Sequence, residues 1–135
     1  MNRLDIKIDL DPVNDGAEII ETKIRKKYEG ALIIATNGKS RIAGTDEAEE
    51  IILKLGENGE GIGLGNSFYI AIYNWHKVLD MGQGKCLIGS VIIMKRRDNK
   101  LYPLEGDDFE NAAREFQSRL VTVVGDGQEF SALEL

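Results

Sequence analysis

The chain has 135 residues, 42% hydrophobic and 30% charged, which is the size and composition of one globular domain. Its formal net charge of −6 disfavours a protein that mainly grips nucleic-acid backbone, because that role needs a basic face. Cys86 is the only cysteine, which excludes a disulfide within the chain and favours a reducing, cytoplasmic location. No apolar run has the length of a membrane-spanning helix, and the N-terminus lacks the apolar core of a signal peptide.

The N-terminal part predicts a strand followed by a helix. Residues 3–10 alternate charged and apolar side chains, which is the period of a half-buried strand. Pro12 ends this strand because it lacks the N–H donor that a sheet needs. Apolar residues recur at helical spacing over 15–28, and Gly30 suits the end of that helix.

A hairpin and a second helix are expected next. Residues 31–36 and 39–43 flank an Asn-Gly pair, which tolerates positive φ at both central positions of a tight turn. The sequence therefore predicts a β-hairpin with a two-residue turn. A helix is expected over 46–55, with Thr45 as its N-cap.

The middle of the chain predicts a loop and several strands. Residues 56–66 contain five glycines and predict a loop. Residues 67–75 are rich in aromatic and β-branched side chains and predict a strand. A largely buried strand is expected over 85–95, followed by a turn at 97–99 and a short strand at 100–102.

The C-terminal part predicts a third helix and a final strand or hairpin. Asp107 and Glu110 form a capping-box pattern where the helix begins. The segments VTVV and FSALEL flank a Gly-Asp-Gly turn and predict strands. The apolar positions at helical spacing are Phe109, Ala112, Ala113, Phe116 and Leu120.

The predicted order is β-α-β-β-α-β-β-β-α-β, with no internal repeat and no linker. We therefore expect residues 1–135 to form a single α+β domain. Hairpins dominate the connections, which favours a mainly antiparallel sheet with two to three amphipathic helices on one face.

The glycine-rich loop is one candidate binding site. Gly61, Gly63 and Gly65 can turn backbone N–H groups toward an anion. However, the chain runs here from helix to loop to strand, the reverse of phosphate-binding loops, and Glu57 and Glu60 repel phosphate. An exposed connection is the simpler interpretation, and a peptide or a cationic partner suits the charge better than a nucleotide.

An aromatic row is the second candidate. Tyr69, Tyr73 and Trp75 share one face of the strand predicted at 67–75, and we expect the aliphatic face to enter the core. The row is then partly exposed and suits stacking on bases or a protein interface. The alternative is that a helix or loop covers the row.

We predict no catalytic residue, no metal site and no cofactor. His76 is the sole histidine, and it approaches Cys86 only if 67–76 and 85–95 form a hairpin. An apolar strand favours Cys86 as a small buried hydrophobe. Helix capping explains the acidic residues between 107 and 110.

The leading hypothesis is a non-enzymatic protein-interaction or regulatory module of inhibitor or immunity type. Its acidic segment 45–60 and its aromatic row would recognise a basic protein partner. One alternative is a small-molecule or nucleotide-binding domain that uses the glycines of 56–66 with the basic cluster at 95–100. A second alternative is nucleic-acid binding through 95–100. A homodimer, formed by edge pairing of the terminal FSALEL strand, is also open.

Overall fold

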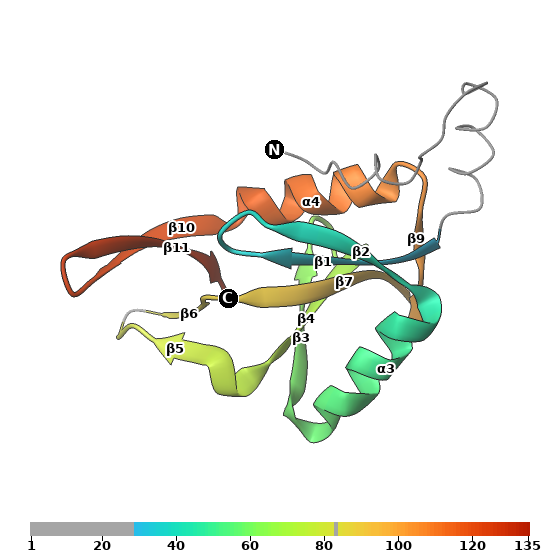
Figure 1. The fold of residues 1–135 in the computed structure, drawn as a ribbon, viewed down its shortest axis with the longest axis horizontal. Coiled ribbons are helices and arrows are strands. Elements are labelled where there is room, and N and C mark those ends of the chain that lie inside the picture. Colours follow the sequence, from blue (N-terminus) through green and yellow to red (C-terminus); the bar gives the residue numbers. More distant parts are fainter. Residues whose placement is uncertain (1–28, 83) are drawn as a thin grey trace.

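The computed structural model describes residues 29–82 and 84–135 (Figure 1). The strand predicted at 3–10 and the helix predicted at 15–28 lie outside these described residues. Two helices and a mainly antiparallel arrangement of strands confirm the α+β class. No helix in the described ranges is long and apolar enough to cross a membrane.

Two helices, two short 3₁₀ turns and eleven strands make up the described chain. In chain order, the first half comprises β1 (Glu29–Ala35), β2 (Ser40–Gly44), α3 (Thr45–Leu55), η1 (Gly56–Asn58), β3 (Gly59–Leu64), β4 (Tyr69–Asn74) and η2 (Trp75–Lys77). The second half comprises β5 (Val78–Asp80), β6 (Lys85–Leu87), β7 (Ser90–Arg97), β8 (Lys100–Tyr102), β9 (Leu104–Glu105), α4 (Asp108–Ser118), β10 (Leu120–Gly125) and β11 (Gln128–Glu134).

The larger sheet has the strand order β2-β1-β7-β4-β3, and neighbouring strands in it are antiparallel. After β7 the chain turns back, and β8 pairs with the end of β7. The next strand, β9, pairs with the start of β1 instead. Residues 100–105 therefore fill the space where β7 and β1 separate.

The smaller sheet has the order β10-β11-β6-β5 and carries the C-terminal hairpin (Figure 1). Leu87 of β6 and Leu133 of β11 lie opposite each other and are fully buried. They belong to the same apolar cluster as Phe116 of α4 and Ile93 of β7. The two sheets are therefore joined by one continuous core.

The helices cover opposite faces of the larger sheet, so the expectation that they share one face is wrong (Figure 1). One apolar cluster joins Phe116 of α4 to Ile93 of β7. The other joins Ala48 of α3 to Ile92, the adjacent residue of the same strand. Because successive strand residues point to opposite faces, the two helices lie on opposite sides of β7.

The central strands explain this arrangement, because they are apolar on both faces. In β4, Tyr69, Ala71 and Tyr73 belong to the cluster beneath α4. Ile70 and Ile72 of the same strand belong to the cluster beneath α3. A strand without polar alternation is typical of burial on both faces. The prediction of helices on one face failed because it was inferred from the hairpin connections alone, and the aromatic face of β4 was expected to be partly exposed to solvent.

The first hairpin closes through three residues, whereas two were predicted. The Ala35 N–H donates to the Lys39 carbonyl, and the Gly38 N–H donates to the Ala35 carbonyl, both at 2.9 Å. Gly38 has a φ of +97°, but Asn37 does not adopt a positive φ. This is the pattern of a type I turn followed by a left-handed glycine, so the hairpin prediction is confirmed and its turn type is corrected.

The segment predicted as one strand at 85–95 forms two strands, β6 and β7, which belong to different sheets. The break lies at Ile88 and Gly89, between the two strands. Thr36 stabilises this break through two hydrogen bonds to Gly89. The Thr36 N–H donates to the Gly89 carbonyl at 2.9 Å, and the Thr36 hydroxyl oxygen accepts from the Gly89 N–H at 3.1 Å. A buried polar side chain thereby fixes the point where the chain changes sheets.

Both helices form where they were predicted, but their caps differ. Thr45 is the first residue of α3, and Gly44 occupies the N-cap position. Asp107 is the N-cap of α4, but its side chain caps no backbone N–H. Asp108 instead accepts a hydrogen bond from the Glu105 N–H at 3.0 Å, so the predicted capping box is wrong.

Candidate functional site

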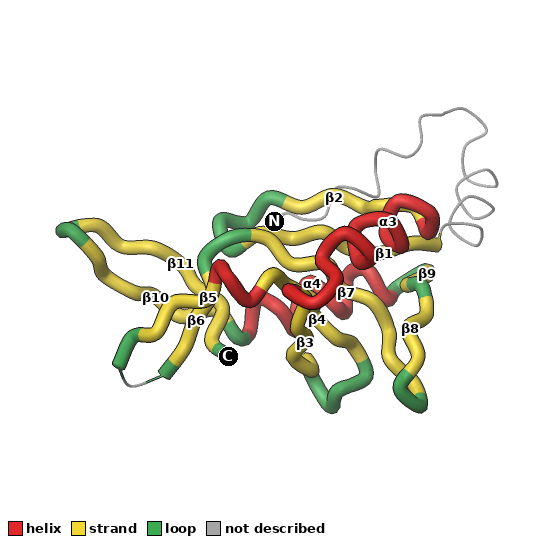
Figure 2. Tube along the Cα trace, turned by 90° about the horizontal axis from the view of Figure 1, so that it is seen from below, coloured by secondary structure: helices red, strands yellow, loops and turns green. Residues whose placement is uncertain are grey.

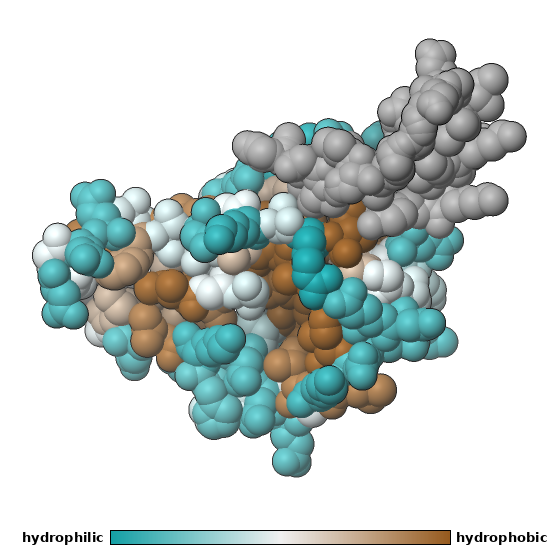
Figure 3. Space-filling model, in the orientation of Figure 1, coloured by the Kyte–Doolittle hydropathy of each residue, from teal (hydrophilic) through white to brown (hydrophobic). Residues whose placement is uncertain are grey.

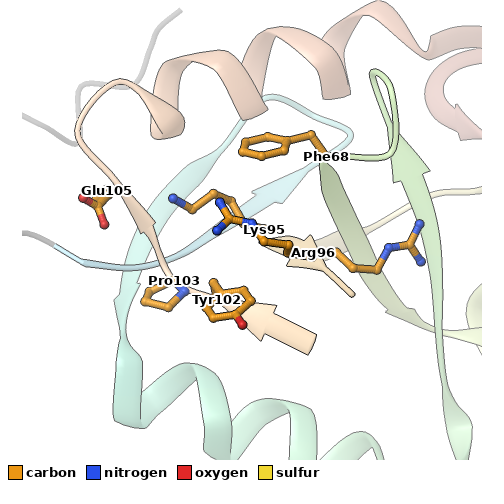
Figure 4. A pocket seen from close by; sticks show the side chains of 7 residues that line it. Phe68, Lys95, Arg96, Tyr102, Pro103 and Glu105 are labelled. Atoms are coloured by element: carbon orange, nitrogen blue, oxygen red, sulfur yellow. The ribbon is translucent and has the colours of Figure 1, made fainter. Parts of the chain in front are cut away.

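A basic hollow lies where the chain passes from β8 to β9. Tyr102 of β8 is opposite Lys95 of β7, whereas Leu104 of β9 is opposite Gly30 of β1. Pro103 sits between these two pairings. The hollow lies where the chain changes its pairing partner from β7 to β1, and its volume is about 230 Å³ (Figure 4). Its lining residues are Phe68, Lys95, Arg96, Arg97, Tyr102, Pro103 and Glu105.

Two aromatic rings border the basic hollow. The carbonyl of Phe68 accepts a hydrogen bond from the Arg96 N–H at 2.9 Å, which holds the segment before β4 beside β7. Tyr102 ends β8. Phe68 is 43% exposed and Tyr102 is 40% exposed, so part of each ring is open to a ligand. Figure 4 shows the Lys95 side chain between the Phe68 ring and the segment of Tyr102 and Pro103.

A largely buried ion pair fixes Lys95 beside the hollow. Lys95 Nζ lies 3.0 Å from Asp108 Oδ2, and both side chains are 17% exposed. Asp108 Oδ2 also accepts from the Glu105 N–H, and Oδ1 accepts from the Tyr69 hydroxyl, both at 3.0 Å. Because both carboxylate oxygens are engaged, Asp108 has one orientation and positions the lysine.

The two arginines of the hollow have no carboxylate partner within the described ranges. The guanidinium carbon of Arg97 lies 5.7 Å from the ring centroid of Tyr102, which is a cation–π distance. The Arg96 side chain makes no hydrogen bond within the described ranges. Even when the carboxylates of Asp108 and Glu105 are included, positive charges outnumber negative ones around the hollow. This local excess attracts anions although the whole chain is acidic.

Tyr69 supports the ion pair as a neutral phenol. Burial raises the pKa of its hydroxyl to about 12, and the hydrogen bond to Asp108 acts in the same direction. Both effects disfavour the phenolate, because the phenolate would be desolvated and would lie against a carboxylate. Tyr69 therefore remains a hydrogen-bond donor to Asp108 at neutral pH.

The predicted aromatic row is not a surface. Tyr69 and Tyr73 are buried and pack in the core beneath α4, so their expected exposure is wrong. Burial also raises the pKa of the Tyr73 hydroxyl. Trp75 lies beyond β4 in η2, where its half-exposed ring stacks on His76 at 3.9 Å between centroids. The three residues do not form one surface.

The glycine-rich segment is the edge strand β3, and the prediction of a loop is wrong. Gly61 and Gly63 lie in this strand, and Gly65 follows it. A β-carbon at Gly61 would approach Ile70 Cδ1 to 2.6 Å, and one at Gly63 would approach Ser67 Oγ to 2.6 Å. These glycines make room for neighbouring side chains. Because β4 separates β3 from β7, the fold does not join them to the basic cluster.

His76 and Cys86 do not meet in the described structure. β4 pairs with β7, whereas Cys86 lies in β6 opposite Leu79 of β5. The Cys86 side chain is buried, and burial raises the pKa of its thiol. His76 is exposed. The residues that the structure describes contain no group of three His, Cys, Asp or Glu side chains that could hold a metal ion.

Comparison with known proteins adds no further residue to the site. No family model, curated protein or solved structure matches this chain. Sequence reasoning identified the basic cluster at 95–100 but missed Phe68, Tyr102 and Asp108. These residues reach the cluster only through the pairing of β4 and β8 with β7 and through the start of α4. An aromatic residue just after a basic hairpin turn was the one available signal.

Proposed function

We propose that the basic hollow binds a small phosphorylated ligand that carries an aromatic ring, such as a nucleotide. The proposal rests on one observation: two arginines without a carboxylate partner in the described ranges lie beside two half-exposed aromatic rings. Guanidinium groups bind phosphate oxygens through paired hydrogen bonds. Aromatic rings stack on bases and tolerate different bases, since every base has a π-face.

The size and charge of the hollow define the ligand further. Its volume of about 230 Å³ is below the roughly 300–1,000 Å³ of most small-molecule pockets, which favours one nucleotide over a larger cofactor. Lys95 is already paired with Asp108, and Arg96 points to the opposite face of β7 from Lys95 and Arg97, so the phosphate is expected at Arg97. Glu105 offers an acceptor for an amino or hydroxyl group of the same ligand.

Calorimetric titration with ATP, GTP and inorganic phosphate tests this proposal. Nucleotides should bind, and Arg97→Ala should weaken binding at least about tenfold, the effect of losing roughly 1.4 kcal/mol, whereas Arg96→Ala should weaken binding less. Arg41→Ala is the matched control, because Arg41 is an exposed arginine paired with Glu47 at 2.7 Å. The aromatic rings are tested by Tyr102→Ala, which should weaken nucleotide binding more than it weakens phosphate binding.

Three outcomes would contradict the nucleotide proposal. The first is no binding to the wild-type chain at millimolar nucleotide. The second is that Arg97→Ala binds the nucleotide as tightly as the wild-type chain does. The third is tighter, strongly salt-dependent binding of a single-stranded oligonucleotide, which would favour the nucleic-acid alternative.

The protein-interaction module remains a second proposal, supported by the outer face of α3. Leu53 is 78% exposed there, in the company of exposed acidic residues that include Glu49 and Glu50. An exposed leucine one helical turn from exposed carboxylates suits a partner with an apolar site and basic surroundings. A partner retained by the wild-type chain should be lost with Glu49→Lys and kept with Glu129→Lys, an exposed carboxylate on β11. Retention by both variants would exclude α3.

A further inference from the structure

The smaller sheet has an open edge at β10. This strand pairs with β11 along its whole length, and no strand pairs with its other side within the described chain. The hairpin of β10 and β11 extends away from the larger sheet in two perpendicular views (Figures 1 and 2). The sequence left open whether the FSALEL segment pairs within the chain or with a neighbour, and in the structure it lies in β11, which pairs with β10 and, at Leu133 and Glu134, with β6. Within the described ranges β11 pairs with β6 only at Leu133 and Glu134, so β10 is the strand of this hairpin whose outer edge is open along its whole length.

β10 lacks the usual protection of an edge strand. Soluble proteins guard such edges with charged residues, prolines or very short strands. The other terminal strands of the two sheets follow this rule, with Arg41 in β2, Glu60 in β3 and Asp80 in the three-residue β5. The sequence of β10, LVTVVG, contains neither charge nor proline. Val124 is 65% exposed in this unguarded strand.

The backbone of β10 offers free hydrogen-bonding groups at this edge. The turn residues Asp126 and Gly127 both have positive φ, at 50° and 77°, which is the pattern of a two-residue hairpin loop. The flanking residues of such a loop bond to each other, and the bonding direction alternates along the strand from there. Thr122 and Val124 therefore turn their N–H and C=O groups toward the open edge.

We propose that this edge binds a second copy of the chain, by antiparallel pairing of β10 with β10 about a two-fold axis. Two identical strands can pair with each other in the antiparallel sense. Because β10 is uncharged, such a pair places no like charges opposite each other. Val121 and Val123 share a face with Phe130 by register, and apolar side chains gather over the smaller sheet (Figure 3). Pairing continues this apolar face across both copies. The edge also lies away from the acidic helix α3, which limits repulsion between two chains of charge −6 (Figure 1).

Sedimentation velocity of the full chain over a range of concentrations tests this inference. The wild type should sediment as a dimer, and Thr122→Pro should give a monomer, because proline removes an outward N–H without touching the bonds to β11. Thr122→Val keeps that N–H and should remain a dimer. Val124→Lys places a guarding charge at the exposed edge and should also give a monomer, which decides the question if the proline variant fails to fold.

A monomeric wild type would overturn the inference. It would mean that the edge of β10 is unpaired or pairs within its own chain, for example with the strand predicted at 3–10. A dimer that persists in both Thr122→Pro and Val124→Lys would place the interface elsewhere and overturn it equally. The inference is independent of the basic hollow, so nucleotide binding is expected to be the same in the monomeric variants.

Discussion

Asp108 shows how one residue at a helix start organises a surface. Its carboxylate accepts from the Tyr69 hydroxyl and the Glu105 N–H and pairs with Lys95, each at 3.0 Å. The neighbouring Asp107, at the N-cap, is exposed and makes no such bond. Two adjacent aspartates of the same charge therefore have very different roles, and only the side chain directed into the sheet supports the hollow.

Asp108→Asn should lower the free energy of unfolding by about 2 kcal/mol. The substitution leaves Lys95 as a largely buried cation without its counter-charge, which costs more than a surface ion pair is worth. Urea denaturation measures the change, and Asp107→Asn should stay within about 0.5 kcal/mol of wild type. Equal effects of the two substitutions would show that the buried pair does not contribute to stability.

Tyr69 should make the fold less stable in alkali. Its folded pKa of about 12 lies above the ordinary value near 10, so its contribution is complete below about pH 10 and is lost as pH rises toward 12. Between about pH 9 and pH 11, ionisation of Tyr69 should lower the free energy of unfolding of the wild-type chain by about 1 kcal/mol. Tyr69→Phe should flatten the decline by that amount in parallel denaturant titrations. An unchanged slope would contradict the raised pKa.

At the scale of elements, the pairing of β1 with β2 depends on a close backbone approach. Gly30 of β1 lies opposite Gly44 of β2. A β-carbon at Gly30 would overlap the Ala43 carbonyl oxygen, whereas one at Gly44 would meet nothing within 4 Å. The same change at two paired positions therefore has different consequences.

Gly30→Ala should destabilise the chain by about 2–3 kcal/mol, because the atom that must move is a backbone carbonyl. Gly44→Ala is the matched control, since its φ of −64° and ψ of 167° suit alanine. It should be neutral or slightly stabilising, because alanine restricts the unfolded chain. Urea midpoints of the two variants measure the difference, and similar midpoints would contradict the close approach.

At the scale of the molecule, one core holds both sheets together. Leu133 of the smaller sheet is fully buried in the cluster that contains Phe116 and the central strands. Leu53, on the outer face of α3, is exposed. Because the sheets share a core, loss of packing in the smaller sheet should lower the stability of the whole chain in one cooperative transition.

Leu133→Ala should lower the free energy of unfolding by about 2–4 kcal/mol, the usual range for a buried leucine. Leu53→Ala should lower it by less than about 0.5 kcal/mol. Trp75 fluorescence and circular dichroism should report the same midpoint in each variant. Two separated transitions in Leu133→Ala would show that the smaller sheet unfolds independently and that the core is not shared.

Sequence reasoning located most local elements and few of their partners. The helix over 46–55, the hairpin around Asn37 and the short strand at 100–102 were all predicted, because periodicity and turn residues act within a few positions. The glycine-rich strand β3 was missed, because glycine normally weakens a strand and here serves close packing. Of the candidate site, only the basic cluster was visible in advance.

The sequence by itself determined the α+β class, the antiparallel character and the apolar periodicity of both described helices. The tertiary structure decided that these helices cover opposite faces, that Asp108 holds Lys95, and that β10 is left at an open edge. The reason is physical. Helix periodicity and turn chemistry depend on neighbours along the chain, whereas strand order and face assignment depend on pairing between distant segments, which no local pattern specifies.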